Sequence, residues 1–259
     1  MGFSMIDTHC HLYVKAFDID SEAVMQRAIQ AGISKFYMPA IDSSCTERME
    51  RLKAKFPRVC FLMAGLHPCS VKEDFEIELA HVKDLLSKNI YSGIGETGLD
   101  LYWDKTFVKE QIVALEIQAE LALQYKLPLI LHTRNATQET IDIIKNFKGR
   151  GLTGIFHCFG GTMEEASQIM GLGFSMGIGG VVTYKNSGLA EVLATVPMEH
   201  LVLETDAPYL SPVPMRGKRN ESSYLIYIAQ KLSEVKNLPV DEIRRITTEN
   251  AEKIFCLRA

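Results

Sequence analysis

The chain has 259 residues, close to the roughly 250 that one (β/α)8 barrel needs, although two domains of about 130 residues would also fit. Hydrophobic residues make up 47% of the chain and charged residues 23%, which suits a globular protein with a sizeable core. The net charge of −4 argues against a protein coated with non-specific nucleic-acid contacts, although it permits a local basic patch.

The sequence predicts neither membrane insertion nor export. No apolar run approaches the ~20 residues of a transmembrane helix, and the N-terminus lacks the pattern of a signal peptide. We therefore expect a cytoplasmic protein, and we treat residues 1–4 as a candidate extension before Met5. The cysteines are scattered without a C-x-x-C pair, which predicts reduced, mostly buried thiols at Cys10, Cys45, Cys60, Cys69, Cys158 and Cys256.

Short β-rich segments alternate with longer helical patterns along the whole chain. The predicted strands are, in order, Met5–His9, Lys35–Ala40, Val59–Leu66, Ser92–Glu96, Leu127–His132, Thr153–His157, Gly173–Gly177 and Leu201–Thr205. The predicted helices are Ser21–Ala31, Thr46–Phe56, Glu76–Lys88, Thr106–Tyr125, Thr137–Phe147, Met163–Leu172, Gly188–Val196, Ser222–Glu234 and Val240–Phe255.

This alternation predicts a parallel sheet, because each parallel crossover needs a helix to return the chain. Eight units without a break in composition favour an α/β fold of the (β/α)8 TIM-barrel type, with parallel strands and an extra C-terminal helix, over an open sheet. The glycine-rich fingerprint of a dinucleotide-binding sheet is missing after the first strand. We expect residues 1–259 to form one domain.

Polar residues recur where the predicted strands end. His9 and His11 lie two residues apart at the end of the first strand, and alternation along a strand would direct both imidazoles to the same side. The H-x-H pattern alone is a weak signal. The same placement recurs later, at His67, Glu96, His132, His157 and Asp206. His81 and His200 lie elsewhere, so the shared placement of the others favours one site at the barrel mouth.

The nitrogen and oxygen ligands predicted here suit zinc, magnesium, manganese, cobalt or nickel, and the sequence does not choose between them. Buried carboxylates among imidazoles need a compensating charge, which a metal supplies. One hydrolytic zinc ion uses three protein ligands and an open position. The larger set is therefore typical of two divalent ions bridged by a carboxylate.

Taken together, the motifs resemble those of the TatD-type metal-dependent deoxyribonucleases, a family of amidohydrolase-like barrels, and the resemblance extends from Met5 onward. The ordered motifs are Asp7-Thr-His-Cys-His11, Gly65-Leu-His-Pro68, Gly95-Glu-Thr-Gly-Leu-Asp100, Leu131-His-Thr-Arg134, Phe156-His-Cys-Phe-Gly160, Glu204-Thr-Asp-Ala-Pro-Tyr209 and Pro214-Met-Arg-Gly-Lys-Arg-Asn220. Thr97 departs from the family pattern without affecting a presumed ligand.

The resemblance implies a site with two metal ions that activates water to cleave DNA. His9, His11 and Asp206 would bind one ion, His132 and His157 the other, and Glu96 would bridge both. Asp206 would also be the general base. His67 would act in catalysis by contacting a substrate phosphate or positioning the leaving group. The equally weighted alternative is that it orients Glu96 or caps a loop.

Further residues are candidates for holding the substrate. Arginine suits phosphate because its planar fork donates two parallel hydrogen bonds, so the candidate phosphate-binding residues are Arg134, Arg216, Lys218 and Arg219. A solvated basic loop is the alternative for the last three. Tyr102, Trp103 and Tyr209 are candidates for stacking on a splayed base, with packing or a lid as the alternative for Trp103. Asp100 is expected to cap the loop after Glu96.

Three functions remain open on the sequence alone. The leading hypothesis is an exonuclease-like deoxyribonuclease acting on single-stranded DNA or DNA ends, with no obligate protein partner. The second is the same metal site hydrolysing another bond, such as an ester, lactone, amide or aminoacyl-tRNA ester, because a fold does not determine a substrate. The third is a non-enzymatic metal-binding or partner-docking barrel.

Overall fold

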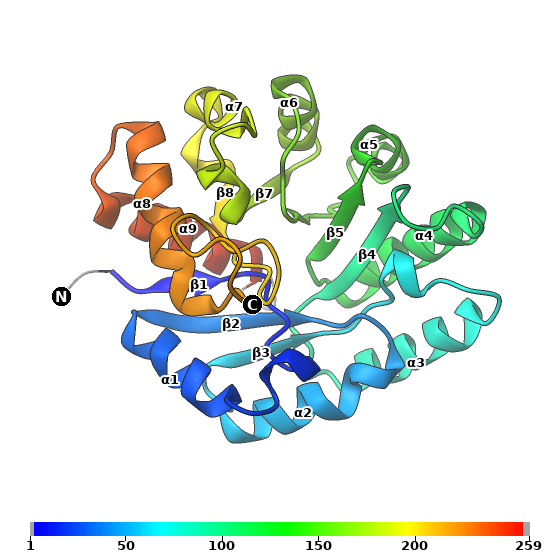
Figure 1. Cartoon of the computed structure of the whole chain (residues 1–259). Coiled ribbons are helices and arrows are strands. Elements are labelled where there is room, and N and C mark those ends of the chain that lie inside the picture. The colour runs from blue at the N-terminus through cyan, green and yellow to red at the C-terminus, as the bar shows by residue number, and fades with distance from the viewer. Residues whose placement is uncertain (1–2, 256–259) are drawn as a thin grey trace.

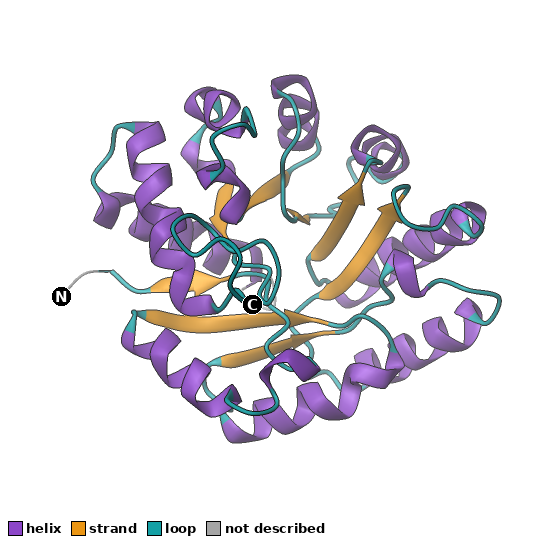
Figure 2. Ribbon diagram, viewed as in Figure 1, coloured by secondary structure: helices purple, strands orange, loops and turns teal. Residues whose placement is uncertain are grey.

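Eight strands and nine α-helices alternate along residues 3–255, the part of the chain that this computed structural model describes (Figures 1 and 2). The strands are β1 (Met5–Asp7), β2 (Ile33–Pro39), β3 (Cys60–Met63), β4 (Ile94–Asp100), β5 (Leu129–Arg134), β6 (Gly154–Phe156), β7 (Phe174–Ile178) and β8 (Leu201–Leu203). The helices are α1 (Ser21–Gln30), α2 (Thr46–Lys55), α3 (Phe75–Ser87), α4 (Val108–Tyr125), α5 (Thr137–Lys145), α6 (Met163–Gly171), α7 (Leu189–Thr195), α8 (Leu225–Lys236) and α9 (Val240–Phe255).

Every predicted strand and helix is present, with shifted ends. β4 continues past Glu96 to Asp100, whereas the sequence pattern places its end at Glu96. β1 and β8 each end two residues earlier than predicted. The backbone turns at Asp206, whose φ of 54° lies in the left-handed region, so the polar residues that follow these two strands belong to turns.

The strands form a ring, and hydrogen bonds close both gaps between its two sheets. All neighbouring strands pair in parallel, in the orders β1-β2-β3 and β4-β5-β6-β7-β8. Between β3 and β4, the amide of Ala64 donates to Gly93 at 3.1 Å and that of Gly95 donates to Ala64 at 2.9 Å. Between β8 and β1, the amide of Thr8 donates to Leu203 at 3.1 Å. The chain therefore folds as a TIM barrel.

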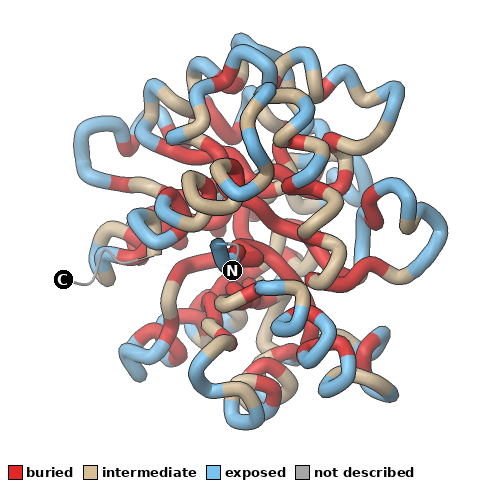
Figure 3. Tube along the Cα trace, turned by 90° about the vertical axis from the view of Figure 1, so that its left-hand side faces the viewer, coloured by how far each residue is buried: buried red, intermediate tan, exposed pale blue. Residues whose placement is uncertain are grey.

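Two apolar clusters fill the molecule. The smaller takes one residue from each of six strands and one from α9, namely Ile6, Tyr37, Met63, Ile130, Ile155, Val202 and Ala251. Their neighbours along the strands belong to the larger cluster, which also holds the buried faces of the helices. Because side chains alternate along a strand, the smaller cluster fills the inside of the ring and the larger lies between ring and helices. Buried chain accordingly runs through the centre of Figure 3.

The ends of several helices follow from local sequence. α6 begins with a capping box in which the Thr162 hydroxyl accepts from the Glu165 amide and the Glu165 carboxylate accepts from the Thr162 amide. α4 and α8 are each followed by a residue with left-handed backbone, Lys126 and Asn237 respectively. No helix among residues 3–255 has the length and apolar character needed to cross a membrane.

The described cysteines are free thiols, as expected from their spacing. Cys10, Cys45 and Cys60 are buried, whereas Cys69 and Cys158 are partly exposed. Cys256 lies outside the described residues.

Candidate metal centre at the carboxyl ends of the strands

Six side chains with nitrogen or oxygen ligand atoms meet at the carboxyl ends of five strands. They are His9 and His11 after β1, Glu96 in β4, His132 in β5, His157 after β6 and Asp206 after β8. The barrel thus brings together residues that span almost 200 positions of sequence, at the end where parallel barrels carry their chemistry. His9 is fully buried, Asp206 is 9% exposed, and His132 is partly exposed.

Glu96 lies at the centre of the cluster and reaches both pairs of histidines. Its Oε2 atom lies 3.2 Å from Nε2 of His9 and 3.3 Å from Nε2 of His11. Its Oε1 atom lies 2.9 Å from Nδ1 of His132 and 2.8 Å from Nε2 of His157. The two carboxylate oxygens therefore face different histidine pairs, as a bridging ligand must.

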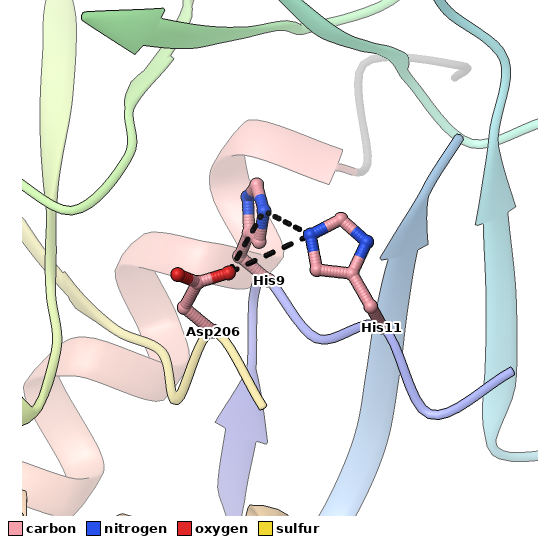
Figure 4. Close-up of side chains that lie close together, drawn as sticks. All are labelled: His9, His11 and Asp206. Atoms are coloured by element: carbon pink, nitrogen blue, oxygen red, sulfur yellow. Dashed lines mark hydrogen bonds and ion pairs between the residues drawn. The ribbon is translucent and has the colours of Figure 1, made fainter. Parts of the chain in front are cut away.

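Asp206 faces the first pair. Figure 4 shows His9, His11 and Asp206 converging from the ends of β1 and β8, with one carboxylate oxygen of Asp206 directed at the rings and the other away from them. The nearer oxygen lies 3.5 Å from Nε2 of His11 and 3.7 Å from Nε2 of His9. The three side chains form one group of atoms that could hold an ion.

Tyr13 fixes the proton of the His11 ring. The Tyr13 hydroxyl donates to the carbonyl of Pro39 at 2.6 Å, and Nδ1 of His11 lies 2.9 Å from the same hydroxyl oxygen. Because that hydroxyl has a single proton, Nδ1 of His11 must be the donor. Nε2 of His11 then faces Glu96 and Asp206 with the atom that a cation would bind.

Asp100 does the same for His132. One of its oxygens lies 3.0 Å from Nε2 of His132, and Nδ1 of that ring points at Glu96. The other oxygen accepts from the amides of Tyr102 at 2.9 Å and Trp103 at 3.0 Å. Asp100 therefore caps the loop after β4, as expected from the sequence. Its contact with His132 was not predicted. Such carboxylate–histidine pairs orient metal ligands.

Glu204 supports His157, and sequence reasoning missed it. This carboxylate is fully buried, accepts from the amide of Cys158 at 2.6 Å and lies 3.5 Å from Nδ1 of His157. Its second oxygen has no hydrogen-bond partner and packs against Gly177, where a Cβ atom would lie 1.9 Å from it. The available signal was an acidic residue two positions before Asp206 at the end of a buried strand.

Asp7, at the end of β1, contacts the turn that follows β8. Sequence reasoning did not predict this contact. The Asp7 carboxylate accepts from the amide of Thr205 at 2.9 Å and from the hydroxyls of Thr205 and Ser222, each at 2.6 Å. Burial raises the pKa of Asp7 to about 7, although these hydrogen bonds act to lower it. The carboxylate joins the β1 and β8 turns that carry His9 and Asp206.

The electrostatics of the cluster attract positive charge. Burial acts to raise the pKa of Glu96, but the surrounding imidazoles, His157 foremost, hold it well below its usual range. Burial acts to lower the pKa of His11, but the carboxylates of Asp206 and Glu96 raise it to about 9. The negative charge of Asp206 and Glu96 that favours a proton on His11 would also favour a metal cation. A metal cation would compete with that proton for the same ring nitrogen.

The spacing of ring nitrogens gives a second indication that cations belong here. Nε2 of His9 lies 3.2 Å from Nε2 of His11, and Nδ1 of His132 lies 3.3 Å from Nε2 of His157. Two lone pairs at such separations repel each other unless a proton or a cation lies between them. The donor chemistry of the cluster therefore fits bound metal ions.

His67 lies beside the cluster on the loop after β3. Its Nδ1 atom accepts from the amide of Cys69 at 3.0 Å, so Nε2 carries the proton and donates to Glu96 at 3.2 Å. His67 thus contacts both its own loop and Glu96, and with Glu96 and His132 it forms a further group of atoms that could hold an ion. Its role stays a prediction. The ring also stands edge to face with His132 at 4.5 Å between centroids.

The predicted basic residues have different surroundings. Arg134 is exposed beside the rings of Tyr102 and Trp103. Arg216 packs over the ring of Tyr184 at 4.1 Å from its centroid, and Lys218 is exposed.

Arg219 is engaged elsewhere. Its guanidinium forms a bidentate pair with Asp20 at 2.8 and 2.7 Å and donates to the carbonyl of Ala16 at 2.6 Å. This side chain holds the loop after β8 against the start of α1, and it also lines a surface pocket with Arg27 and Lys218. A role for Arg219 in phosphate binding stays a prediction.

Comparison with known proteins supplies the family. The family model described as TatD related DNase matches residues 6–256. An uncharacterized metal-dependent hydrolase, YabD of Bacillus subtilis strain 168, is 36% identical over 97% of this chain and 98% of that protein. The protein named 3'-5' ssDNA/RNA exonuclease TatD of Pantoea ananatis strain LMG 20103 is 31% identical over 98% of this chain and all of that protein.

Comparison with solved structures gives the same family and fold. The crystal structure of YjjV, a TatD homolog from Escherichia coli K12, superposes with a TM-score of 0.91 at 31% identity, over 97% of this chain and 98% of that one. A phosphotriesterase homology protein from Escherichia coli shares the fold at a TM-score of 0.70 and 13% identity, over 98% of each chain. The family model and the relatives named as hydrolases favour an enzyme over the third alternative, a non-enzymatic barrel. The chain is a metal-dependent hydrolase that belongs to the TatD family.

Proposed function

We propose that this protein is a nuclease that hydrolyses phosphodiester bonds at the ends of single-stranded DNA, with two divalent ions held by the six-residue cluster. The observation that carries the proposal is the position of Glu96, with one oxygen facing each histidine pair. The relative named as a single-strand exonuclease supports the choice of nucleic acid as substrate.

In the proposed arrangement the ligands divide into two sets around Glu96. His9, His11 and Asp206 would hold one ion, and His132 and His157 the other. Divalent ions in such a site lower the pKa of a water molecule and withdraw negative charge from a phosphoryl oxygen. The supporting carboxylates Asp100 and Glu204 would keep the imidazoles in place.

Asp206 is suited to accept a proton. Burial acts to raise its pKa, but hydrogen bonding to His11 and the nearby His9 leave it lowered, so the carboxylate is ionised at neutral pH. Its second oxygen points away from the rings and would accept the proton of the attacking water (Figure 4). His67 would act through Glu96, to which its Nε2 proton is directed.

Two exposed cations would hold substrate phosphates. Arg134 follows His132 by two residues on β5, so both side chains leave the strand on the same side. Lys218 lies exposed on the loop that follows β8. Arg216 would contribute only after leaving the ring of Tyr184.

A nuclease assay with a ligand variant tests this proposal. We expect the protein loaded with zinc, magnesium or manganese to shorten an end-labelled single strand, and Glu96→Ala to lose at least about a hundredfold in rate, because both ions lose a shared ligand. Glu120→Ala, which removes an exposed partner of Arg150 far from the cluster, is the matched control and should keep the wild-type rate.

The substrate panel separates the proposal from other hydrolases. Blunt duplex DNA, a lactone, a carboxylic ester and an aminoacyl-tRNA are assayed beside the single strand. Equal cleavage by wild type and Glu96→Ala would show that the activity arises elsewhere. Rapid hydrolysis of one of the other substrates with none of the single strand would overturn the nuclease assignment and keep the metal site.

A further inference from the structure

We propose that Tyr102, Trp103 and Arg134 form a subsite that stacks an unpaired nucleobase beside the metal centre. The inference rests on the proposed nuclease function and specifies how the substrate is recognised. We call these three residues the aromatic–arginine rim.

The rim residues lie at the ends of two neighbouring strands. The guanidinium of Arg134, at the end of β5, sits 4.1 Å from the ring centroid of Tyr102 and 5.1 Å from that of Trp103. The two rings meet edge to face, with centroids 4.8 Å apart and planes at 85°. Arg134 therefore occupies the corner between two aromatic rings.

The rings themselves are open to solvent. Tyr102 is 51% exposed and Trp103 is 66% exposed, although both belong to residue types that normally bury their large apolar surface. Ordinary core packing explains neither position. Exposed aromatic faces beside an exposed guanidinium are the arrangement that binds single-stranded nucleic acid, because bases stack on rings and phosphates bind the cation.

The rim is tied to the metal centre through Asp100. One oxygen of Asp100 accepts from the amides of Tyr102 and Trp103, and its other oxygen holds the His132 ring. A second tie joins the same strands, because the amide of Leu101 donates to the carbonyl of Arg134 at 2.9 Å. A base held on the rim is thus positioned relative to His132 by one buried carboxylate.

The geometry favours an unpaired base. In a duplex both faces of each base are already stacked on neighbouring bases. Such a base has no free face to stack on Tyr102 or Trp103. At a strand end the outermost base has a free face, and stacking on aromatic side chains contributes regardless of sequence. We expect the rim to favour single strands without a strong sequence preference.

The only tryptophan in the chain is Trp103, so intrinsic fluorescence reports on the rim directly. Magnesium-loaded protein is titrated with a phosphorothioate-linked oligothymidylate, which resists hydrolysis. We expect saturable quenching of the tryptophan emission. An abasic oligomer with the same backbone should quench far less, since it offers phosphates but no base to stack.

Variants then measure the contribution of each side chain, with binding followed by the anisotropy of a fluorescein-labelled strand. Trp103→Ala and Arg134→Ala should each weaken binding by roughly 5- to 100-fold, and Trp103→Phe should recover most of the loss because it keeps a ring. The matched control is Arg150→Ala, which removes an arginine over Phe147 at the opposite end of the barrel and should bind like wild type.

The outcomes separate this inference from the nuclease proposal. If wild type cleaves the single strand while its tryptophan emission is unmoved and Trp103→Ala binds normally, the rim is no subsite and the nuclease assignment stands. If the protein neither cleaves nor binds the strand, both fail. An emission shift on simple dilution, without nucleic acid, would show that a second copy of the chain covers the rings and would also overturn the inference.

Discussion

The residues that support the cluster decide how well it can hold ions. Each imidazole has two nitrogens, and a group that binds the second nitrogen orients the first toward an ion. Tyr13 does this for His11 and Asp100 for His132. Nδ1 of His9 has no such partner among the described residues. Nδ1 of His157 has no hydrogen-bond partner in that part of the chain either, and its nearest anionic group is the fully buried Glu204 carboxylate at 3.5 Å.

Removing the charge of Glu204 tests its supporting role. We expect Glu204→Gln to fold, because the amide has the same shape, but to bind zinc about 10- to 100-fold more weakly, since Nδ1 of His157 loses its anionic neighbour. Competition with a chelating dye measures the affinity, and circular dichroism checks the fold. Glu120→Gln serves as the control. Wild-type affinity in Glu204→Gln would show that the carboxylate does not act on the metal ligands.

At the scale of elements, the positions of the ligands depend on how closely neighbouring strands pack against the side chains that support the cluster. β7 passes directly beside Glu204, and Gly177 leaves room for that carboxylate, because any Cβ atom there would overlap its Oε2. Gly171, at the end of α6, has open space instead, since a Cβ atom added there would meet nothing within 4 Å. The two glycines therefore serve different purposes.

Alanine at these two glycines should have opposite effects. We expect Gly177→Ala to lower the free energy of unfolding by about 1–3 kcal/mol, because the added methyl group displaces Glu204 or β7. Gly171→Ala should leave that free energy unchanged or raise it by up to about 1 kcal/mol, because glycine disfavours a helix. Urea denaturation followed by circular dichroism measures both. Equal stability of the two variants would mean that β7 and Glu204 are not tightly packed.

The order of the elements could be predicted from sequence because hydrophobic periodicity records which faces are buried. The chain positions of the cluster could be predicted because carboxyl ends of parallel strands share one end of a barrel. Contacts that form only after folding could not. The sequence showed Arg219 in a basic run, and its partner Asp20 lies nearly 200 residues away. Likewise, no local pattern indicates that Asp100 touches His132.

At the scale of the whole molecule, the barrel acts as a frame that gathers distant ligands. Asp7 links the turns after β1 and β8, and the Arg219–Asp20 pair holds the long loop after β8 against α1. These contacts close the ring on the side where its first and last strands meet. The candidate metal centre would depend on that closure, because His9, His11 and Asp206 follow the two strands at the junction.

Counting bound metal tests the central claim most directly. Purified protein is saturated with zinc, passed through a desalting column and analysed by inductively coupled plasma mass spectrometry, beside Glu96→Ala and the Glu120→Ala control. We predict about two ions per chain for wild type and the control, and at most about one for Glu96→Ala, because both ions share that carboxylate. Two tightly bound ions in Glu96→Ala would contradict the account.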